Sequence, residues 1–401
     1  MMRGAIFAAV VFATVTGVAQ SAPPAGAPFE LDAIIPGSGS AAFLGKSYLD
    51  AFRALENRVN ASGGINGQPL KIVTFDSATT PQTGVQLVNG LVAKGVSVFI
   101  DGGPVSVCNA SAPLVAQSGP VDYCLSPLIQ PSAGSFVFSA GADSLSYTKA
   151  GLRYYRESGV KRIAVIATTD ASGQVYETQT DAAMQLPEFK DMQIVANEKF
   201  APGDVSAAAQ LTRIKAANPQ GLIVYVTGTP LATVLRAIQD SGLDVPVQIL
   251  SSNAVYAQMS GYKSFLPRQL LFTTVLALTT NDPPPGPVGD QQRAYFAAFK
   301  GIGVRPDYLD NVAWDPIMIV VDALRHLGTH ATAEQIRQYI EHLHGWVGVN
   351  GTYDFVGGDQ RGIGDSSTEV ARWDAQKDTW VRASLPGGQP LGVRGAQGER
   401  K

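Results

Sequence analysis

The sequence has little of what metal centres and disulfide frameworks require. Its 401 residues include only two cysteines and four histidines. The histidines fall in one short C-terminal stretch, at His326, His330, His342 and His344. His326 and His330 have the spacing of helical metal ligands, but a structural zinc site needs four nitrogen or sulfur ligands around one ion. We therefore interpret this pair as surface residues of a solvated helix and predict no metal site.

Charged residues are also scarce, at 16% of the chain against roughly 25% in an average globular protein. Lys and Arg number 30 and Asp and Glu 33, which gives a net charge of -3, and no block of basic residues is present. Binding to a phosphate backbone depends on clustered Lys and Arg, so we predict no nucleic-acid partner. Hydrophobic residues make up 45% of the chain, enough to build buried cores rather than a disordered chain.

Common catalytic signatures are missing as well. The sequence contains no G-x-S-x-G elbow, P-loop, H-E-x-x-H or C-x-x-C, the patterns of common hydrolases, nucleotidases, zinc proteases and redox proteins. Residues 37–42 fit a degenerate G-x-G-x-x-A between a strand and a helix. The acidic residue that should end the second strand about 20 positions later comes only at Asp76. We expect neither a cofactor nor an enzyme.

The first residues are typical of an export signal. Met1-Met2-Arg3 precedes an uncharged run over residues 4–18, followed by small residues that offer a cleavage point after Ala19 or Ser21. A membrane anchor is the alternative, but the run is shorter than the ~20 residues of a bilayer span, and no later segment is long and apolar enough to span one. We expect residues 1–21 to be a cleaved signal peptide and the protein to be periplasmic.

Cys108 and Cys124 are separated by 16 positions. Export would place them in an oxidising compartment, where disulfides persist. We expect Cys108 at the start of a helix and Cys124 on the strand that follows, which βαβ packing brings near each other. A disulfide is the favoured interpretation, and two reduced, buried cysteines are the alternative.

Strands and helices alternate along most of the chain, with a period of roughly 30 residues, as in βαβ units. We expect strands at residues 31–35, 70–75, 96–100, 121–125, 163–168, 194–200, 222–226, 247–250 and 270–276. Three helical segments follow, and residues 351–384 have the pattern of short antiparallel strands. Strands that alternate with helices form a parallel sheet covered on both faces. The fold class is therefore α/β, with two doubly wound parallel-sheet lobes.

Ligands of such sheets bind at the carboxyl ends of the strands. The loops expected there are rich in Gly and Ser, at residues 36–42, 102–108, 126–130, 169–173, 227–230 and 251–254. Unpaired N–H groups at helix starts favour negatively charged groups. The loops therefore predict a cleft for a small carboxylate or another ligand rich in hydrogen-bond acceptors, and no chemistry is required of it.

Several ordered segments resemble the type I periplasmic solute-binding proteins of ABC transporters, in the leucine/isoleucine/valine-binding branch. The segments are residues 35–45, 60–67, 103–106, 126–127, 163–173, 200–204, 311–315, 348–355 and 360–362. The resemblance covers nearly the whole chain after the signal peptide. It implies two lobes joined by three crossovers that close around a ligand and dock onto an ABC permease in the inner membrane.

The implied organisation places residues 27–141 and 276–343 in the first lobe and residues 142–275 and 344–385 in the second. Residues 386–401 are expected to form a flexible tail. We expect a monomer. Two alternatives remain, a ligand-sensing receptor of the same fold and an exported enzyme with a non-standard site.

The resemblance also implies a set of ligand contacts. They are Gly39, Leu44, Val105, Ser106, Val107, Cys108, Leu128, Gln130, Asp143, Ser172, Thr229 and Asn253. Val107 stands where amino-acid binders commonly have a second Ser, which leaves the Ser106 hydroxyl and the N–H groups of Val107 and Cys108 as donors.

The most informative departure is Asn253, at the position that normally offers a carboxylate to an α-ammonium group. An amide cannot pair with a buried ammonium, and Asp143 is the only substitute that the implied set contains. The predicted ligand is therefore a small carboxylate-bearing solute, either an amino acid or an aromatic or aliphatic acid without an amine.

Overall fold

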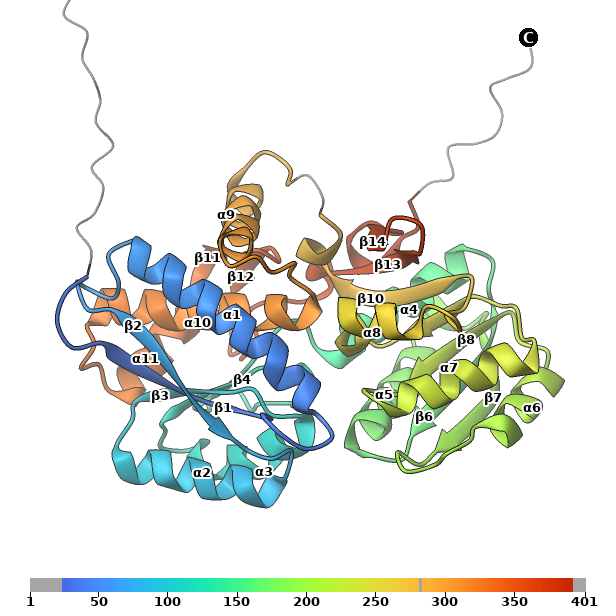
Figure 1. Cartoon of the computed structure of the whole chain (residues 1–401), viewed down its shortest axis with the longest axis horizontal. Coiled ribbons are helices and arrows are strands. Elements are labelled where there is room, and N and C mark those ends of the chain that lie inside the picture. The colour runs from blue at the N-terminus through green and yellow to red at the C-terminus, as the bar shows by residue number, and fades with distance from the viewer. Residues whose placement is uncertain (1–23, 281–282, 392–401) are drawn as a thin grey trace, which may run out of the picture.

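The computed structural model describes residues 24–280 and 283–391, so the predicted signal peptide lies outside the described residues. These residues form two lobes that lie side by side, each built on its own β-sheet (Figure 1). None of the helices within the described ranges is both long and apolar enough to cross a bilayer.

The first lobe contains a five-stranded parallel sheet in the order β2-β1-β3-β4-β5. Its strands are β1 (Phe29–Ile35), β2 (Leu70–Asp76), β3 (Val98–Asp101), β4 (Val121–Cys124) and β5 (Val137–Ser139). Its helices are α1 (Ala42–Ala61), α2 (Pro81–Lys94), α3 (Val105–Val115), α10 (Tyr308–Leu327) and α11 (Ala333–Glu341). Helices α2 and α3 lie on one face of the sheet, and α1 and α10 lie on the other (Figure 1). The central strands β3 and β4 are buried throughout, as a sheet covered on both faces requires.

The second lobe contains a seven-stranded sheet in the order β14-β13-β10-β9-β8-β6-β7. Its parallel strands are β6 (Arg162–Thr168), β7 (Gln193–Phe200), β8 (Gly221–Tyr225), β9 (Val247–Ile249) and β10 (Leu270–Val275). Strands β13 (Thr368–Asp374) and β14 (Thr379–Arg382) add an antiparallel edge. The helices are α4 (Ser144–Glu157), α5 (Ala171–Met184), α6 (Ala208–Ala216), α7 (Pro230–Ser241) and α8 (Tyr256–Tyr262). The predicted α/β class with two parallel-sheet lobes is confirmed.

The predicted disulfide between Cys108 and Cys124 is present, with 6.3 Å between the two Cα atoms. It joins the first turn of α3 to the last residue of β4. Both side chains are fully buried, so the bridge fixes the start of α3 against the carboxyl end of the sheet.

The hairpin of β11 (His344–Val347) and β12 (Thr352–Asp354) packs on the first lobe, although the sequence placed residues 344–385 in the second. The reason is Asp315, a buried carboxylate of α10. It accepts hydrogen bonds from Val349 N (3.0 Å) and Tyr353 Oη (2.9 Å) of the hairpin. Phe355 then packs edge-on against Phe138 of β5. The chain rejoins the second lobe only at β13.

Residues 386–391 are packed rather than loose, although the sequence predicted a flexible tail from residue 386. The short 3-10 helix Pro386–Gly388 lies against α4, and the guanidinium of Arg153 donates to the Gly387 carbonyl. A further backbone bridge joins Ser384 to Pro390. The rest of the predicted tail, residues 392–401, lies outside the described residues.

Three crossovers connect the lobes, and their described residues, 140–143, 276–280, 283–286 and 355–367, are here called the hinge. The third crossover is hydrogen-bonded to β5 and α4, the elements on either side of the first crossover. Lys149 Nζ donates to Asp365 Oδ2 at 2.7 Å, and Arg361 Nη1 donates to Ser139 Oγ at 2.7 Å. Charged groups thus fix the third crossover. Helix α9 (Pro287–Gly301) packs on the first lobe, against α1 (Figure 1).

Candidate functional site

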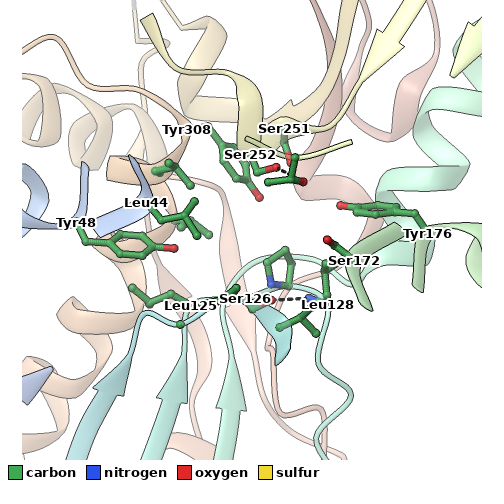
Figure 2. A pocket seen from close by; sticks show the side chains of 17 residues that line it. Leu44, Tyr48, Leu125, Ser126, Leu128, Ser172, Tyr176, Ser251, Ser252 and Tyr308 are labelled. Carbon is green, nitrogen blue, oxygen red and sulfur yellow. Dashed lines mark hydrogen bonds between the residues drawn. The ribbon is translucent and has the colours of Figure 1, made fainter. Parts of the chain in front are cut away.

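A cavity lies between the lobes at the carboxyl ends of the parallel strands and holds about 590 Å³ of space, part of it open to solvent. The first lobe supplies α1, the loops after β3 and β4, and the start of α10. The second lobe supplies α5, the loop after β8 and the residues after β9 (Figure 2). The lining residues are Leu44, Tyr48, Gly103, Pro104, Val105, Leu125, Ser126, Pro127, Leu128, Ser172, Tyr176, Thr227, Ser251, Ser252, Tyr308, Leu309 and Val312. A pocket lined by two lobes is a typical place for a small ligand to bind.

Three tyrosine hydroxyls converge on this cavity from three different helices. Figure 2 shows Tyr48 from α1, Tyr308 from α10 and Tyr176 from α5 directed toward its centre. Each side chain is at most 5% exposed. Burial is the main cause that raises the pKa of all three phenols above the ordinary value. The three groups are therefore protonated at neutral pH. The Tyr308 hydroxyl donates to Tyr147 Oη at 3.4 Å, so the donors that can serve a ligand are those of Tyr48 and Tyr176.

Smaller hydroxyl residues line the remaining polar edge of the cavity. Ser126 Oγ accepts from Leu128 N at 3.4 Å, and Thr227 Oγ1 lies 3.3 Å from Ser252 Oγ. Ser172 Oγ donates to Asp170 Oδ1 at 2.9 Å. A hydroxyl has one donor and two acceptor positions, so these groups keep capacity to bind a ligand.

None of the 17 lining residues, all from the described part of the chain, is charged. Two carboxylates lie just behind the wall, and both already accept hydrogen bonds from other groups of the protein. Asp101 accepts from Gly103 N (2.9 Å) and Ser111 Oγ (2.8 Å). Asp307 caps α10 by accepting from Leu309 N at 2.9 Å. The polar character of the cavity is therefore that of neutral hydroxyl groups.

Apolar side chains form most of the wall, including Leu44, Leu125, Leu128, Leu309 and Val312. The lobes meet at the rim, where a Cβ atom added to Gly228 of the second lobe would lie only 3.1 Å from the Phe43 ring of the first. The bare glycine at residue 228, which also has a positive φ of 76°, allows this approach.

Four of the predicted contacts line the cavity, namely Leu44, Val105, Leu128 and Ser172. The sequence interpretation missed all three tyrosines. Tyr48 lies four residues after Leu44 in α1, and Tyr176 lies four residues after Ser172 in α5. Residues four apart share a helix face, so this spacing was the signal that could have identified them.

The predicted donors on α3 do not line the cavity. The N–H groups of Val107 and Cys108 donate to the Pro104 carbonyl at 2.8 and 3.2 Å, and the Cys108 sulfur belongs to the disulfide. Ser106 is half-buried and is not part of the cavity wall. The first turn of α3 uses these groups for its own structure.

Asn253 is buried and has a structural role that explains the amide. Its Oδ1 accepts from Gly228 N at 3.1 Å, and its Nδ2 donates to the Val226 carbonyl at 2.8 Å. A carboxylate could not make the second bond, because it has no donor. The residues at this place that face the cavity are Ser251 and Ser252.

The remaining predicted contacts lie elsewhere in the lobes. Asp143 caps α4 by accepting from Ser146 N. Gly39 has a φ of 84°, and a Cβ there would lie 2.7 Å from the Ala78 carbonyl oxygen, so it serves a turn. Gln130 and Thr229 are exposed, and neither forms part of the cavity wall.

Two α/β lobes that enclose a cavity at their strand ends define a two-lobed solute-binding protein. The sequence pattern of the periplasmic binding protein family matches residues 33–378, so the chain belongs to that family. This confirms the resemblance found in the sequence. The family and the fold are those of solute-binding proteins rather than enzymes, and membership implies a periplasmic location.

Curated relatives with similar sequences are amino-acid-binding proteins. An amino acid binding protein of Pseudomonas aeruginosa is 26% identical over 229 residues, which cover 52% of this chain and 56% of the relative. The Leu/Ile/Val-binding protein BraC3 of Rhizobium johnstonii is 24% identical, with 54% of this chain and 59% of the relative covered. The chain thus spans less than 60% of the length of these two relatives.

Solved structures share the fold over most of the chain. An extracellular ligand-binding receptor from Rhodopseudomonas palustris HaA2 has a TM-score of 0.78 at 18% identity and covers 89% of this chain and 100% of its own. A leucine binding protein LivK from Thermotoga maritima has a TM-score of 0.72 at 16% identity, with 86% and 95% covered. At these identities the likeness shows the fold alone.

Proposed function

We propose that this chain is the periplasmic substrate-binding component of an ABC importer. It captures a small carboxylate-bearing solute between its two lobes, which close around it, and delivers the solute to a permease in the inner membrane. The cavity between the lobes carries the proposal, because a buried space lined by both lobes links ligand binding to their relative position. The names of the curated relatives, which bind amino acids, support a solute of this size.

The proposal includes export of the chain and a monomeric binding unit. Residues 1–21 act as a cleaved signal peptide, which supplies the periplasmic location that the family implies. Among the predicted contacts, Leu44, Val105, Leu128 and Ser172 touch the solute from opposite lobes.

A thermal unfolding screen tests the function with free amino acids and monocarboxylic acids as probes. A ligand at 100 times its Kd stabilises the folded state by about 2.7 kcal/mol, which should raise the Tm measurably. Calorimetry on each positive compound should give one site per chain. If no member of either panel stabilises the protein, the proposal is wrong.

A variant that fills the cavity tests the position of the site, and a variant of an exposed residue on the same helix is its control. Ser172→Trp should abolish binding, because the indole would occupy the space beside Tyr176 on α5. Gln174→Trp changes an exposed position of the same helix and should leave affinity unchanged. Equal affinities for the two variants would place the ligand outside the cavity.

A further inference from the structure

The cavity wall distinguishes between the two ligand classes that the sequence left open. A free amino acid carries both an ammonium and a carboxylate group, and both would be buried when the lobes close. A buried ammonium needs hydrogen-bond acceptors and is best paired with a carboxylate, whereas a buried carboxylate needs hydrogen-bond donors. The described residues that line this cavity offer hydroxyl groups and apolar side chains but no carboxylate.

The nearest carboxylates are not free to pair with an ammonium. Asp101 and Asp307 lie behind the wall and accept hydrogen bonds from the protein with both oxygens. Asp170 lies at the rim, where its Oδ1 accepts from Ser172 Oγ, Thr168 Oγ1 and Gly173 N. It is exposed, so water screens its charge from the interior of the cavity.

A carboxylate, in contrast, finds hydroxyl groups on both sides of the cavity. Tyr48 and Tyr308 approach from the first lobe and Tyr176 from the second (Figure 2). Hydrogen bonds from neutral hydroxyls to a carboxylate are charge-assisted and stronger than neutral pairs. Because the donors come from both lobes, the bound carboxylate would also hold the lobes together.

The rest of the wall selects the body of the ligand. Leu44, Leu125, Leu128, Leu309 and Val312 surround the hydroxyl groups. Leucines and valines favour a branched aliphatic chain or a single aromatic ring, because such groups bury apolar surface without leaving a polar atom unpaired.

We propose that the solute is a compact, apolar monocarboxylic acid without an amino group, and that Tyr48 and Tyr176 donate to its carboxylate. The inference rests on the proposed solute-binding function and narrows its ligand class. It assigns to the tyrosines the recognition that the sequence had assigned to α3.

Isothermal titration calorimetry at pH 7 with two matched pairs tests the ligand class. The pairs are 4-methylpentanoate with leucine, and 3-phenylpropanoate with phenylalanine, whose members differ only by the amino group. At least one acid should bind more than 10-fold tighter than its amino acid. Equal or tighter binding of the amino acids overturns this inference and leaves the proposed function intact, whereas failure of all four compounds and of the wider screen overturns both.

Variants of the wall test the assigned residues, with 4-methylpentanoate or 3-phenylpropanoate, whichever binds tighter, as the probe. Tyr48→Phe and Tyr176→Phe each keep the ring and remove the donor, and each should lower affinity for the acid about 5- to 20-fold with little change in Tm. Unchanged affinity in both variants would remove the tyrosines from the recognition of the carboxylate.

A gain-of-function variant separates charge from shape. Ser252→Asp adds a carboxylate to the wall and should shift the preference between leucine and 4-methylpentanoate toward leucine by at least 10-fold. Ser252→Asn has nearly the same shape without the charge and should produce no such shift. The same shift in both variants would contradict the proposed role of charge.

Discussion

The cavity and the hinge lie next to each other but are built from opposite kinds of side chain. Among the residues that the structure describes, those lining the cavity carry hydroxyl and apolar groups and no charge. The hinge holds a buried guanidinium at Arg361 and the ion pair of Lys149 with Asp365. On the strand after the third crossover, Glu369 is fully buried and lies 2.9 Å from Arg382.

This difference indicates a division of roles. Charged groups hold a small number of fixed partners in defined directions, which suits crossovers that set the relation between the lobes. Neutral hydroxyls keep both donor and acceptor capacity, which suits a wall that must bind a solute and release it. If the division is correct, the hinge should dominate stability and its pH dependence, and the cavity should dominate affinity.

Removal of the hinge guanidinium should have the largest effect. Arg361→Met leaves the Ile129 carbonyl without this donor and removes a bond to Ser139 Oγ. Two buried, charge-assisted hydrogen bonds contribute roughly 1.5 to 3 kcal/mol each, so the free energy of unfolding in urea should fall by about 4 kcal/mol. Arg268→Met, at an exposed ion pair, should change it by less than about 1 kcal/mol. Equal losses of stability in the two variants would contradict the special role of charged groups in the hinge.

Loss of the disulfide, which lies at the carboxyl end of the first lobe's sheet, should cause the second largest decrease in the free energy of unfolding. Cys108 and Cys124 are 16 residues apart, and closing a loop of this length stabilises the folded state by about 3 kcal/mol in the chain-entropy model. Urea unfolding of the Cys108→Ser, Cys124→Ser double variant should show this loss. Adding dithiothreitol should destabilise the parent protein to the same extent and leave the variant unchanged; sensitivity of the variant would point to another cause.

Strand β13, which follows the hinge, should also titrate near neutral pH. Burial raises the pKa of Glu369 from 4.5 to about 7, against the opposing effects of Thr279 and Arg382. A folded pKa above the unfolded one means that this stabilisation is complete below pH 4.5 and is lost as the pH rises through 7. At about 1.4 kcal/mol per pKa unit, roughly 2 kcal/mol should disappear between pH 5 and 8.

Urea unfolding across this pH range checks the prediction. Glu369→Gln should flatten the pH profile of the free energy of unfolding relative to the parent protein. An unchanged profile would mean that Glu369 does not titrate in this range.

The smallest expected effect is that of pH on the affinity of the cavity for its ligand. The phenol pKa values of Tyr48, Tyr176 and Tyr308 are all raised above the ordinary value, and the wall has no other ionisable group. The affinity for a carboxylic acid should therefore change less than about 2-fold between pH 6 and 8.5 in calorimetry. A steep dependence would show that an ionised side chain reaches the ligand.

The sequence predicted the fold because the alternation of strands and helices is a local signal that the tertiary structure preserves. The hairpin at residues 344–354 was harder to place, since its attachment to the first lobe depends on Asp315, about 30 residues earlier. Local patterns carry no information on such a long-range contact.

The site was predicted in part, for a similar reason. Leu44 and Ser172 were predicted as ligand contacts, but Tyr48 and Tyr176, one helical turn further on, were not. Asn253 could not be assigned from its residue type, because its role depends on Gly228 and Val226 in a neighbouring loop. Whether such a side chain lines the cavity depends on its direction, which is set by tertiary packing.

Native mass spectrometry of the protein isolated from the periplasm under mild conditions tests the central claim most directly. The compound released on denaturation should be a small monocarboxylic acid that does not react with an amine-specific reagent. A free amino acid recovered at one molecule per chain would contradict the account of an uncharged cavity that recognises its solute through tyrosine hydroxyls.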